Sequence, residues 1–298
     1  MIYFWQDEKL SFLSNFYLQE ITIEGTTYAS VEHYYQSQKT NDPVLKQKII
    51  TASTPGKAKR LGGKIKTNSS WEYEKVSIMI KALREKFKNE ELKEKLLSLN
   101  GEIIEDSPRD FFWGTGEEKG LGTGLNMLGK CLMLIRSYYK KELVFPLNNY
   151  SNPIPINNES SFAHIRKHDI HTGIDLHTEE GSKVLSIAKG KVIKVIHFTG
   201  TKANSPWWEE TDAILVSHSF GVVLYGELTA KVKEGEELEM GQEIGLIKRV
   251  LKTNKGKPQS MLHLEYYNQK VDDGVVWNLN EDVPKGLLNP YEILVLIQ

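Results

Sequence analysis

The first half of this 298-residue chain holds two carboxylates whose neighbours suit chemistry on a small, ring-containing molecule. Glu32 is followed by a histidine and two tyrosines, and Asp110 by two phenylalanines and Trp113. Carboxylates transfer protons and stabilise positive charge, and tryptophan rings such as Trp71 and Trp113 can stack on a flat heterocycle. Each of these residues alone is common in a protein core or at a helix end, and only their combination indicates a site.

A glycine-rich loop lies between Asp110 and the last helix that we expect in this half. It contains Gly114, Gly116, Gly120, Gly122 and Gly124. Glycines let a backbone approach a ligand closely, and a helix N-terminus offers free N–H groups to phosphate. The spacing matches neither a Walker motif nor a dinucleotide-binding fingerprint, so a flexible loop explains these glycines about equally well. The basic run Lys57-Ala-Lys-Arg60 is, by itself, equally an exposed helix face.

The second half holds residues that could bind a metal ion. His171 and Asp175 are four residues apart, and His263 follows much later in the chain. A catalytic zinc ion takes three nitrogen or oxygen ligands and leaves one position open, which these three side chains could provide. Cys131 is the single cysteine of the sequence, which excludes an internal disulfide and a cysteine-based zinc site.

Periodicity predicts the elements that must position these residues. Helices are expected over residues 31–39, with Ser30 as N-cap, over 72–88, around Leu92 to Leu97, and from about residue 125 onward. Runs rich in Val and Ile predict strands over 183–187, 190–197, 213–218 and 221–225. The expected fold class is multidomain α + β: a mostly α-helical domain at 1–142, a linker rich in Pro, Asn and Ser at 143–160, and an antiparallel all-β domain at 161–298.

Charge and hydropathy exclude several broad classes of function. The chain has 38 Lys and Arg against 39 Asp and Glu, so it lacks the overall positive field of a non-specific nucleic-acid binder. Residues 1–142 carry 22 basic and 19 acidic side chains and the remainder carries 16 and 20, which is typical of two unlike units. Neither a signal-like leader nor an apolar run of membrane-spanning length occurs, so we expect a soluble, cytoplasmic protein without a membrane partner.

Six short motifs in the first half follow the order typical of the NADAR family, the YbiA-like N-glycosidases, and the resemblance covers about residues 10–140. They are Ser14-Asn-Phe-Tyr17, Val31-Glu-His-Tyr-Tyr-Gln36 with Lys39, Gly56-Lys-Ala-Lys-Arg60, Trp71-Glu72, Asp110 with Trp113-Gly-Thr-Gly116, and Asn126-Met-Leu-Gly-Lys-Cys-Leu-Met133 with Arg136. The resemblance implies hydrolysis of an N-glycosidic bond without a cofactor. The implied substrate is a small, nucleotide-like, phosphorylated N-riboside: a riboflavin-biosynthesis intermediate, an ADP-ribose-type conjugate or modified nucleic acid.

The same resemblance implies roles for individual residues. Glu32 and Asp110 would be the catalytic pair, one stabilising the ribose cation and one activating water, in an order that stays open. Trp71 and Trp113 would stack on the leaving base. Lys57 and Arg60 would hold phosphate together with the glycine-rich loop. The remaining substrate contacts would come from Asn15, Phe16, Gln36, Gly114, Gly116 and Asn126.

The second half resembles the LytM and lysostaphin-type zinc endopeptidases over about residues 162–298, with His171, Asp175 and His263 as the implied zinc ligands. Two positions depart from that pattern: Met261 replaces the first histidine of the family's His-x-His, and Glu227 replaces the histidine of its Tyr-x-His-Leu. Those histidines serve proton transfer and intermediate stabilisation in the family. We therefore expect an accessory domain that binds zinc, a peptide or a partner protein without cleaving it, with Glu227 as the base in the alternative of a rewired site.

Two other functions stay open. One is a zinc-dependent endopeptidase of cell-wall type and phage origin, whose first domain binds a nucleotide. The other is a non-enzymatic, nucleotide-sensing scaffold. Zinc content together with peptide cleavage would favour the first, and ligand binding without turnover in either domain would favour the second.

Overall fold

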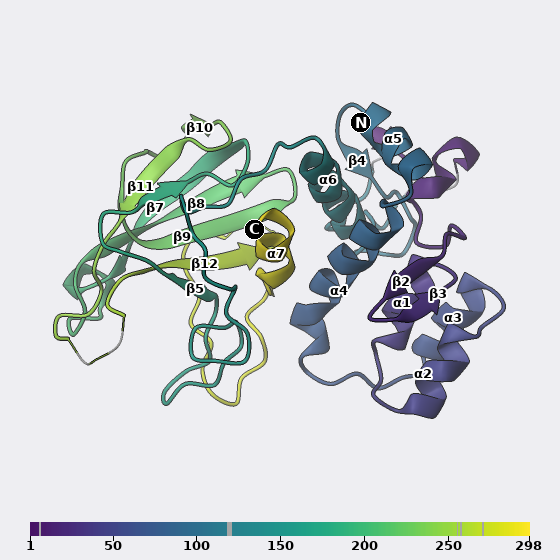
Figure 1. Cartoon of the computed structure of the whole chain (residues 1–298), viewed down its shortest axis with the longest axis horizontal. Helices are drawn as coiled ribbons and strands as arrows, with labels where there is room; N and C mark the ends of the chain where they lie inside the picture. Colours follow the sequence, from purple (N-terminus) through teal and green to yellow (C-terminus); the bar gives the residue numbers. More distant parts are fainter. Residues whose placement is uncertain (6, 118–120, 255, 257, 270) are drawn as a thin grey trace. The chain divides into compact units, whose positions relative to one another are not determined.

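The computed structural model describes residues 1–5, 7–117, 121–254, 256, 258–269 and 271–298. Contacts within the chain divide it into two compact units, Met1–Lys140 and Lys141–Gln298, and each is described by itself (Figure 1). The segment expected as a linker packs within the second unit, where Leu147 forms a bridge with Val184 and Ile154 is buried. Among the described residues, no helix combines the length and the apolar character that a membrane span needs.

The first unit combines helices with two small sheets. Its helices are η1 (Glu8–Leu13), α1 (Val31–Ser37), α2 (Pro43–Ile50), α3 (Pro55–Gly62), α4 (Trp71–Lys86), α5 (Glu90–Ser98) and α6 (Met127–Tyr139). Strand β1 (Ile2–Tyr3) pairs in parallel with β4 (Ile103–Ile104), and β2 (Ile21–Ile23) forms a hairpin with β3 (Thr26–Tyr28). The α-helices take up less than half of the described residues of this unit, so the expectation of a mostly α-helical domain was too strong.

Helix α1 is the central helix of this unit, and all seven of its residues are buried. Ser30 caps it as expected, because its hydroxyl accepts the backbone N–H of His33 and also bonds His33 Nδ1. The other nitrogen of His33 bonds the carbonyl of Ala52, so this histidine is fully engaged in the fold. Because α2, α3 and α4 pack around α1, the residues one turn apart on it, Glu32 and Gln36, face the interior.

Helices α4 and α6 pack against each other and contribute a large share of the apolar core of the first unit. The helical period of α4 buries Val76, Met79, Ile80 and Leu83, and that of α6 buries Leu128, Cys131, Leu132 and Ile135. Burial raises the pKa of the Cys131 thiol to about 12, which is typical of a packed cysteine and not of a reactive one. These two helices therefore form the support on which α1 and the loop before α6 are held.

The second unit is an antiparallel β-sheet with one helix at its end (Figure 1). Its elements are β5 (Ile174–His177), β6 (Lys183–Leu185), β7 (Gly190–Thr199), η3 (Thr201–Ala203), β8 (Thr211–His218), β9 (Gly221–Ala230), β10 (Glu237–Leu238), β11 (Glu243–Ile247), β12 (Met261–Tyr267), β13 (Leu287–Leu288) and α7 (Tyr291–Ile297). The sheet runs β10-β7-β8-β9-β11-β6, and β12 joins β9 to β5. The four predicted strands are present as β6, β7, β8 and β9, whereas β5 and β12, which carry metal-site candidates, had no predicted strand.

Candidate functional site

Glu32 is buried in the first turn of α1, with 5% of its surface exposed. Gln36, one turn later, donates a hydrogen bond of 2.8 Å from Nε2 to Glu32 Oε1. Burial raises the pKa of Glu32, and the bond from Gln36 and the charges of Lys59 and Lys39 oppose that rise. Glu32 is thus a buried carboxyl group with a raised pKa that its polar and charged neighbours partly counteract.

The segment containing Asn15 is fastened beside Glu32 by main-chain bonds. The backbone N–H of Glu32 donates to the carbonyl of Asn15 at 3.1 Å, and Lys86 Nζ donates to the carbonyl of Ser14 at 2.7 Å. Lys86 is fully buried, and its burial lowers the pKa of its ammonium group to about 7. Asn15 Oδ1 is buried and has no hydrogen-bond partner among the described residues, so it is available to a ligand, in keeping with its predicted role.

A third carboxyl group, Glu105, lies close to Glu32 and Asp110, and the sequence motifs did not single it out. Its backbone is fixed on both sides, because its N–H donates to Asn126 Oδ1 and its carbonyl accepts the N–H of Thr115, each at 2.9 Å. Glu105 Oε2 is buried and unpartnered among the described residues. Burial, reinforced by the negative charge of Asp110, raises the pKa of Glu105 to about 8. Glu105 is therefore a neutral carboxylic acid near pH 7.

Asp110 fixes the backbone turn that leads to Trp113, and its negative charge acts on Glu32 and Glu105. Its Oδ1 accepts the backbone N–H groups of Phe112 at 3.2 Å and Trp113 at 2.8 Å, which places Trp113. The charge of Asp110 raises the pKa values of both Glu32 and Glu105. The structure therefore brings the two predicted carboxylates into one electrostatic cluster and adds Glu105 to it.

The two predicted tryptophans both pack against Tyr35. The ring centroid of Tyr35 lies 5.0 Å from that of Trp71 and 5.4 Å from that of Trp113. Lys39 Nζ lies 5.5 Å from the Trp71 centroid and 5.7 Å from that of Tyr35. Trp71 is largely buried and Trp113 half-buried, so Trp113 offers more of its ring to a ligand. Tyr35 and Lys39 are parts of this aromatic group that the predicted site did not include.

Among the basic residues of α3, Lys59, and not its predicted neighbours, acts on the carboxyl cluster by its charge, and Lys39 acts on Glu32 in the same direction. The charge of Lys59 lowers the pKa values of Glu32 and Glu105, and its Nζ lies 5.6 Å above the ring of Phe16. Lys57 is exposed and donates to Ser53 Oγ at 2.7 Å, and Arg60 is exposed as well. The helical period could have identified Lys59, because it lies one turn before Gly62 on α3, and Gly62 faces Gln36.

The glycine-rich loop is packed against its own backbone. A Cβ at Gly122 would lie 1.9 Å from the carbonyl oxygen of Thr115, and one at Gly124 would lie 2.5 Å from that of Gly114. At Gly116, φ is +82° and a Cβ would meet the ring of Phe111 at 2.4 Å. These glycines allow close folding of the loop. Gly120 lies outside the described residues.

Asn126 binds the backbone of the segment that carries Glu105. Its Oδ1 accepts the N–H of Glu105 and its Nδ2 donates to the carbonyl of Ile103, both at 2.9 Å. Its backbone is left-handed, with φ of 51°, directly before α6. Both side-chain polar groups of Asn126 therefore hold the backbone at and just before Glu105, and the substrate contact that the motif suggested stays a prediction.

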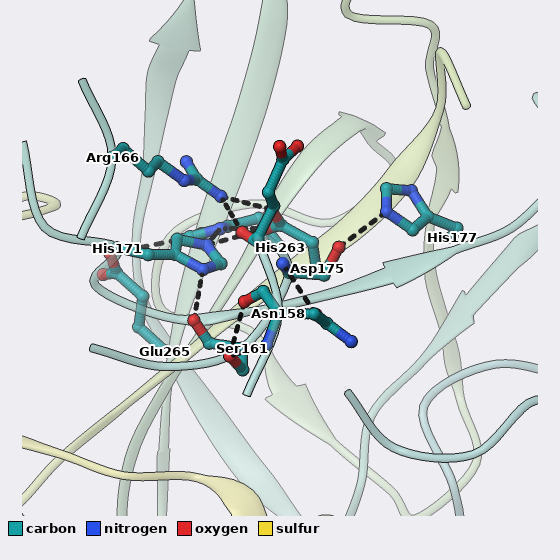
Figure 2. Close-up of polar contacts among 10 residues, drawn as sticks. Asn158, Ser161, Arg166, His171, Asp175, His177, His263 and Glu265 are labelled. Carbon is teal, nitrogen blue, oxygen red and sulfur yellow. Dashed lines mark hydrogen bonds and ion pairs between the residues drawn. The ribbon is translucent and has the colours of Figure 1, made fainter. Parts of the chain in front are cut away.

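In the second unit, His171, Asp175 and His263 converge on one point, as predicted (Figure 2). His171 Nε2 lies 3.0 Å from Asp175 Oδ1 and 3.2 Å from His263 Nδ1, and the last two atoms are 2.7 Å apart. The register of β12 against β5 pairs His263 with Asp175, which explains how residues 88 positions apart meet. Two imidazole nitrogens and one carboxylate oxygen form a donor set that suits zinc.

The groups behind these three side chains orient them for metal binding. His171 Nδ1 bonds the carbonyl of Ser161 at 2.9 Å, and His263 Nε2 lies 3.1 Å from Glu265 Oε1, so the nitrogens that face each other are fixed (Figure 2). Burial lowers the pKa of His263, but hydrogen bonds to Asp175 and Glu265 outweigh it and raise that pKa to about 10. An ion would therefore displace a proton from His263 on binding. The residues present fit a divalent metal.

Two cavities adjoin this centre, with volumes of about 560 and 370 Å³. Asp175 and Met261 line the larger one and His171 and His263 the smaller, whereas Glu227 lines both. Burial raises the pKa of Glu227 to about 8, and the charge of Asp175 adds to this effect. A carboxyl group and a thioether therefore stand where a peptidase of this type would present two histidines.

Comparison with known proteins assigns each unit to a family. The NADAR domain model matches residues 3–139, and the model of peptidase family M23 matches residues 169–273. An N-glycosidase of Nostoc punctiforme is 40% identical over 41% of this chain and 81% of its own length. The N-glycosidase YbiA of Escherichia coli is 37% identical over 41% of this chain and 78% of its own length.

A riboflavin biosynthesis protein of Vibrio vulnificus is 38% identical over 49% of this chain, and the chain spans 40% of the length of that relative. Among solved structures, that of Escherichia coli YbiA aligns with a TM-score of 0.43 and 35% identity, over 47% of this chain and 85% of its own. The catalytic domain of lysostaphin from Staphylococcus simulans aligns with a TM-score of 0.32 and 16% identity, over 46% of this chain and 90% of its own. The chain belongs to the NADAR family, and in it a NADAR domain is followed by a domain of peptidase family M23.

Proposed function

We propose that the first unit hydrolyses the N-glycosidic bond of a phosphorylated N-riboside. The observation that carries this proposal is the cluster of the buried Glu32 with the half-buried Glu105 and Asp110, in which Glu32 and Glu105 have raised pKa values and lysine charges act on the same two groups. Two relatives carry the name N-glycosidase and a third is named as a riboflavin biosynthesis protein. Both names agree with chemistry at a ribose C1.

The cluster supports a division of labour between two carboxyl groups. Glu105, protonated near neutral pH, donates its proton to the leaving nitrogen as the C1–N bond breaks and the electron pair stays on nitrogen. Glu32, in its ionised form, stabilises the ribose cation and takes a proton from the water whose oxygen bonds to C1. The products are ribose phosphate and a free base or amine, and the proton on Glu32 replaces the one that Glu105 gave. Asp110 holds Trp113 and raises the pKa of its two neighbours.

The aromatic group and the lysines would bind the two ends of the substrate. The half-buried ring of Trp113, beside Tyr35, would stack on the leaving heterocycle. Lys39 and Lys59 act electrostatically on Glu32, so they would hold phosphate within reach of the same ribose. Charge-assisted contacts of this kind place C1 against the carboxyl groups.

The test is incubation of the full chain with a phosphoribosylamino-pyrimidine and, separately, with ADP-ribosylated guanosine, followed by mass spectrometry of the released sugar phosphate. We expect release from one of the two substrates. The His171→Ala variant, which alters only the second unit, should retain this activity. No release from either substrate would reject the proposal.

For the second unit we propose an accessory role: it binds a zinc ion and a peptide or protein partner and cleaves no peptide. The specific observation is that Met261 and Glu227 replace the two histidines of the peptidase pattern around a ligand set that is otherwise complete. When bound, zinc could polarise a carbonyl group. Metal analysis should find one zinc per chain that His263→Ala removes, and incubation with a glycine-rich peptide should leave the peptide intact. Cleavage of that peptide would support the endopeptidase alternative instead.

A further inference from the structure

Glu227 is placed by an irregularity in the sheet. In the β8–β9 ladder, Asp212 faces Leu228 and the next residue, Ala213, faces Gly226, so Glu227 is an extra residue without a partner in β8. Its φ of 66° is left-handed, which a residue with a side chain rarely adopts. On the other edge of β9, Gly226 pairs with His263 of β12. Bulges of this kind redirect a side chain, often next to a functional site, and this one adjoins a metal-ligand candidate.

The carboxyl group of Glu227 has no partner that accounts for its burial. Only 6% of the residue is exposed, and Oε2 is buried without a hydrogen bond among the described residues. It lines both cavities beside the His171, Asp175 and His263 centre, and it is close enough to Asp175 for the two charges to interact. The nearby cation Arg166 is already bonded to Asp175 Oδ2 at 2.7 Å. Burying one carboxylate beside another is unfavourable unless a positive charge compensates for it.

The carboxylate of Glu227 lies outside the three donor atoms of His171, Asp175 and His263, which are all within 4.8 Å of one another. We propose that it turns onto the ion as the fourth protein group of the metal centre, so that two histidines and two carboxylates hold the bound metal. This inference rests on the proposed metal binding of the second unit. Two carboxylates balance the charge of a divalent ion, and the bulge and the missing partner of Oε2 both follow from this role. An added oxygen ligand shifts a site towards metals that prefer oxygen, so the centre should bind Mn²⁺ better than a two-histidine, one-carboxylate site does.

The test compares Zn²⁺ and Mn²⁺ binding to the full chain by calorimetry, together with the electron paramagnetic resonance spectrum of bound Mn²⁺. Glu227→Gln should weaken Mn²⁺ binding about 10-fold or more, as loss of a metal-supporting group does, and should change the spectrum. Glu237→Gln on β10, an exposed residue paired with Lys191, is the matched control and should leave both unchanged.

These measurements distinguish the role of Glu227 from metal binding by the second unit, on which that role depends. If the wild type binds neither metal, both fail. If His171→Ala abolishes binding while Glu227→Gln has the affinity and spectrum of the wild type, only the role of Glu227 is overturned. Should Glu227→Gln not fold, Glu227→Asp is measured instead: a shorter carboxylate should weaken Mn²⁺ binding if Glu227 contacts the ion, and unchanged binding would overturn the inference.

Discussion

Gln36 Nε2 donates a 2.8 Å hydrogen bond to Glu32 Oε1 across one turn of the buried helix α1. This bond stabilises the ionised form of a carboxyl group whose pKa burial raises. The protonation of Glu32 therefore depends on one neutral neighbour, Gln36, as well as on the charges of two lysines and of Asp110. If Glu32 must be ionised to receive a proton from water, Gln36 sets the pH at which the first unit becomes active.

Replacing Gln36 with leucine should shift the pH dependence of hydrolysis. Loss of the hydrogen bond raises the pKa of Glu32 further, so the acidic limb of the kcat/KM profile moves to higher pH. A shift of one pKa unit would lower activity on that limb about 10-fold. Gln38→Leu, one turn from Tyr34 and outside the cluster, is the control. An acidic limb at the wild-type pH in Gln36→Leu would show that this bond does not govern Glu32.

A side chain at Gly62 on α3 should change the pH dependence of hydrolysis by disturbing the hydrogen bond between Gln36 and Glu32. A Cβ at this position would lie 1.9 Å from Gln36 Oε1, so Gly62→Ala must displace the amide from Glu32. We expect its pH profile to shift in the same direction as that of Gln36→Leu. Gly56→Ala on the same helix has open space around the new methyl group and should behave as wild type. Equal profiles for both alanine variants would contradict this account of the contact.

Glu105 should make the stability of the first unit fall as pH rises. Its folded pKa of about 8 exceeds the unfolded value of 4.5, so the folded state holds a proton that the unfolded state loses. The stabilisation is complete below about pH 4.5 and is lost as pH rises through about 8. Each unit of pKa difference corresponds to about 1.4 kcal/mol, so the slope is measurable by denaturant unfolding.

Glu105→Gln should flatten that slope between pH 5 and pH 9, because the amide does not titrate. The same variant should lose about 100-fold or more in hydrolysis, as expected for a proton donor. Glu102→Gln, an exposed neighbour on the same segment, is the comparison and should change neither property. If the stability of Glu105→Gln depended on pH as that of the wild type does, the pKa of Glu105 in the wild type would lie near its ordinary value.

Asn126→Ala should destabilise the first unit. Both polar groups of this side chain hold backbone partners, and leaving buried backbone groups unpaired costs about 1–3 kcal/mol. Chemical denaturation should show this loss, whereas Asn100→Ala, at an exposed position, should be neutral. A raised KM at unchanged stability would instead support the direct substrate contact suggested by the motif.

Removing zinc should lower the thermal stability of the second unit. A ligand present at 100 times its Kd stabilises the folded state by about 2.7 kcal/mol, so a chelator should lower the melting temperature by several degrees. His263→Ala should abolish the response to zinc, and His197→Ala, at an exposed position on β7, should preserve it. The prediction fails if zinc and chelator leave the melting curve of the wild type unchanged.

Local sequence patterns located much of this architecture. Amphipathic period identified α4 and α6, and Ser30 was identified as the cap of α1, because these features depend on neighbours within one or two turns. Motif order located the predicted carboxylates Glu32 and Asp110. The strands β5 and β12 were not predicted, because their residues are stabilised by pairing with distant strands and not by local period.

The residues that were missed act through tertiary contacts. The backbone of Glu105 is held by Asn126 and Thr115, which places its carboxyl group near Asp110. This placement raises the pKa of Glu105 and suits it to donate a proton. Lys59 and its neighbours on α3 look alike in the sequence, and the packing of α3 against α1 distinguishes them. Burial and charge of this kind cannot be read from residue order alone.

The most direct test of the central claim compares wild type, Glu32→Gln and Glu24→Gln with the same phosphorylated N-riboside. Glu24 is exposed and pairs with Lys81, so its variant is a control for loss of one carboxylate. We expect Glu32→Gln to bind the substrate still, which mass spectrometry would detect as intact ligand. It should release sugar phosphate at least about 100-fold more slowly than the wild type. Glu24→Gln should hydrolyse the substrate at the wild-type rate. Release by Glu32→Gln at the wild-type rate would contradict the account.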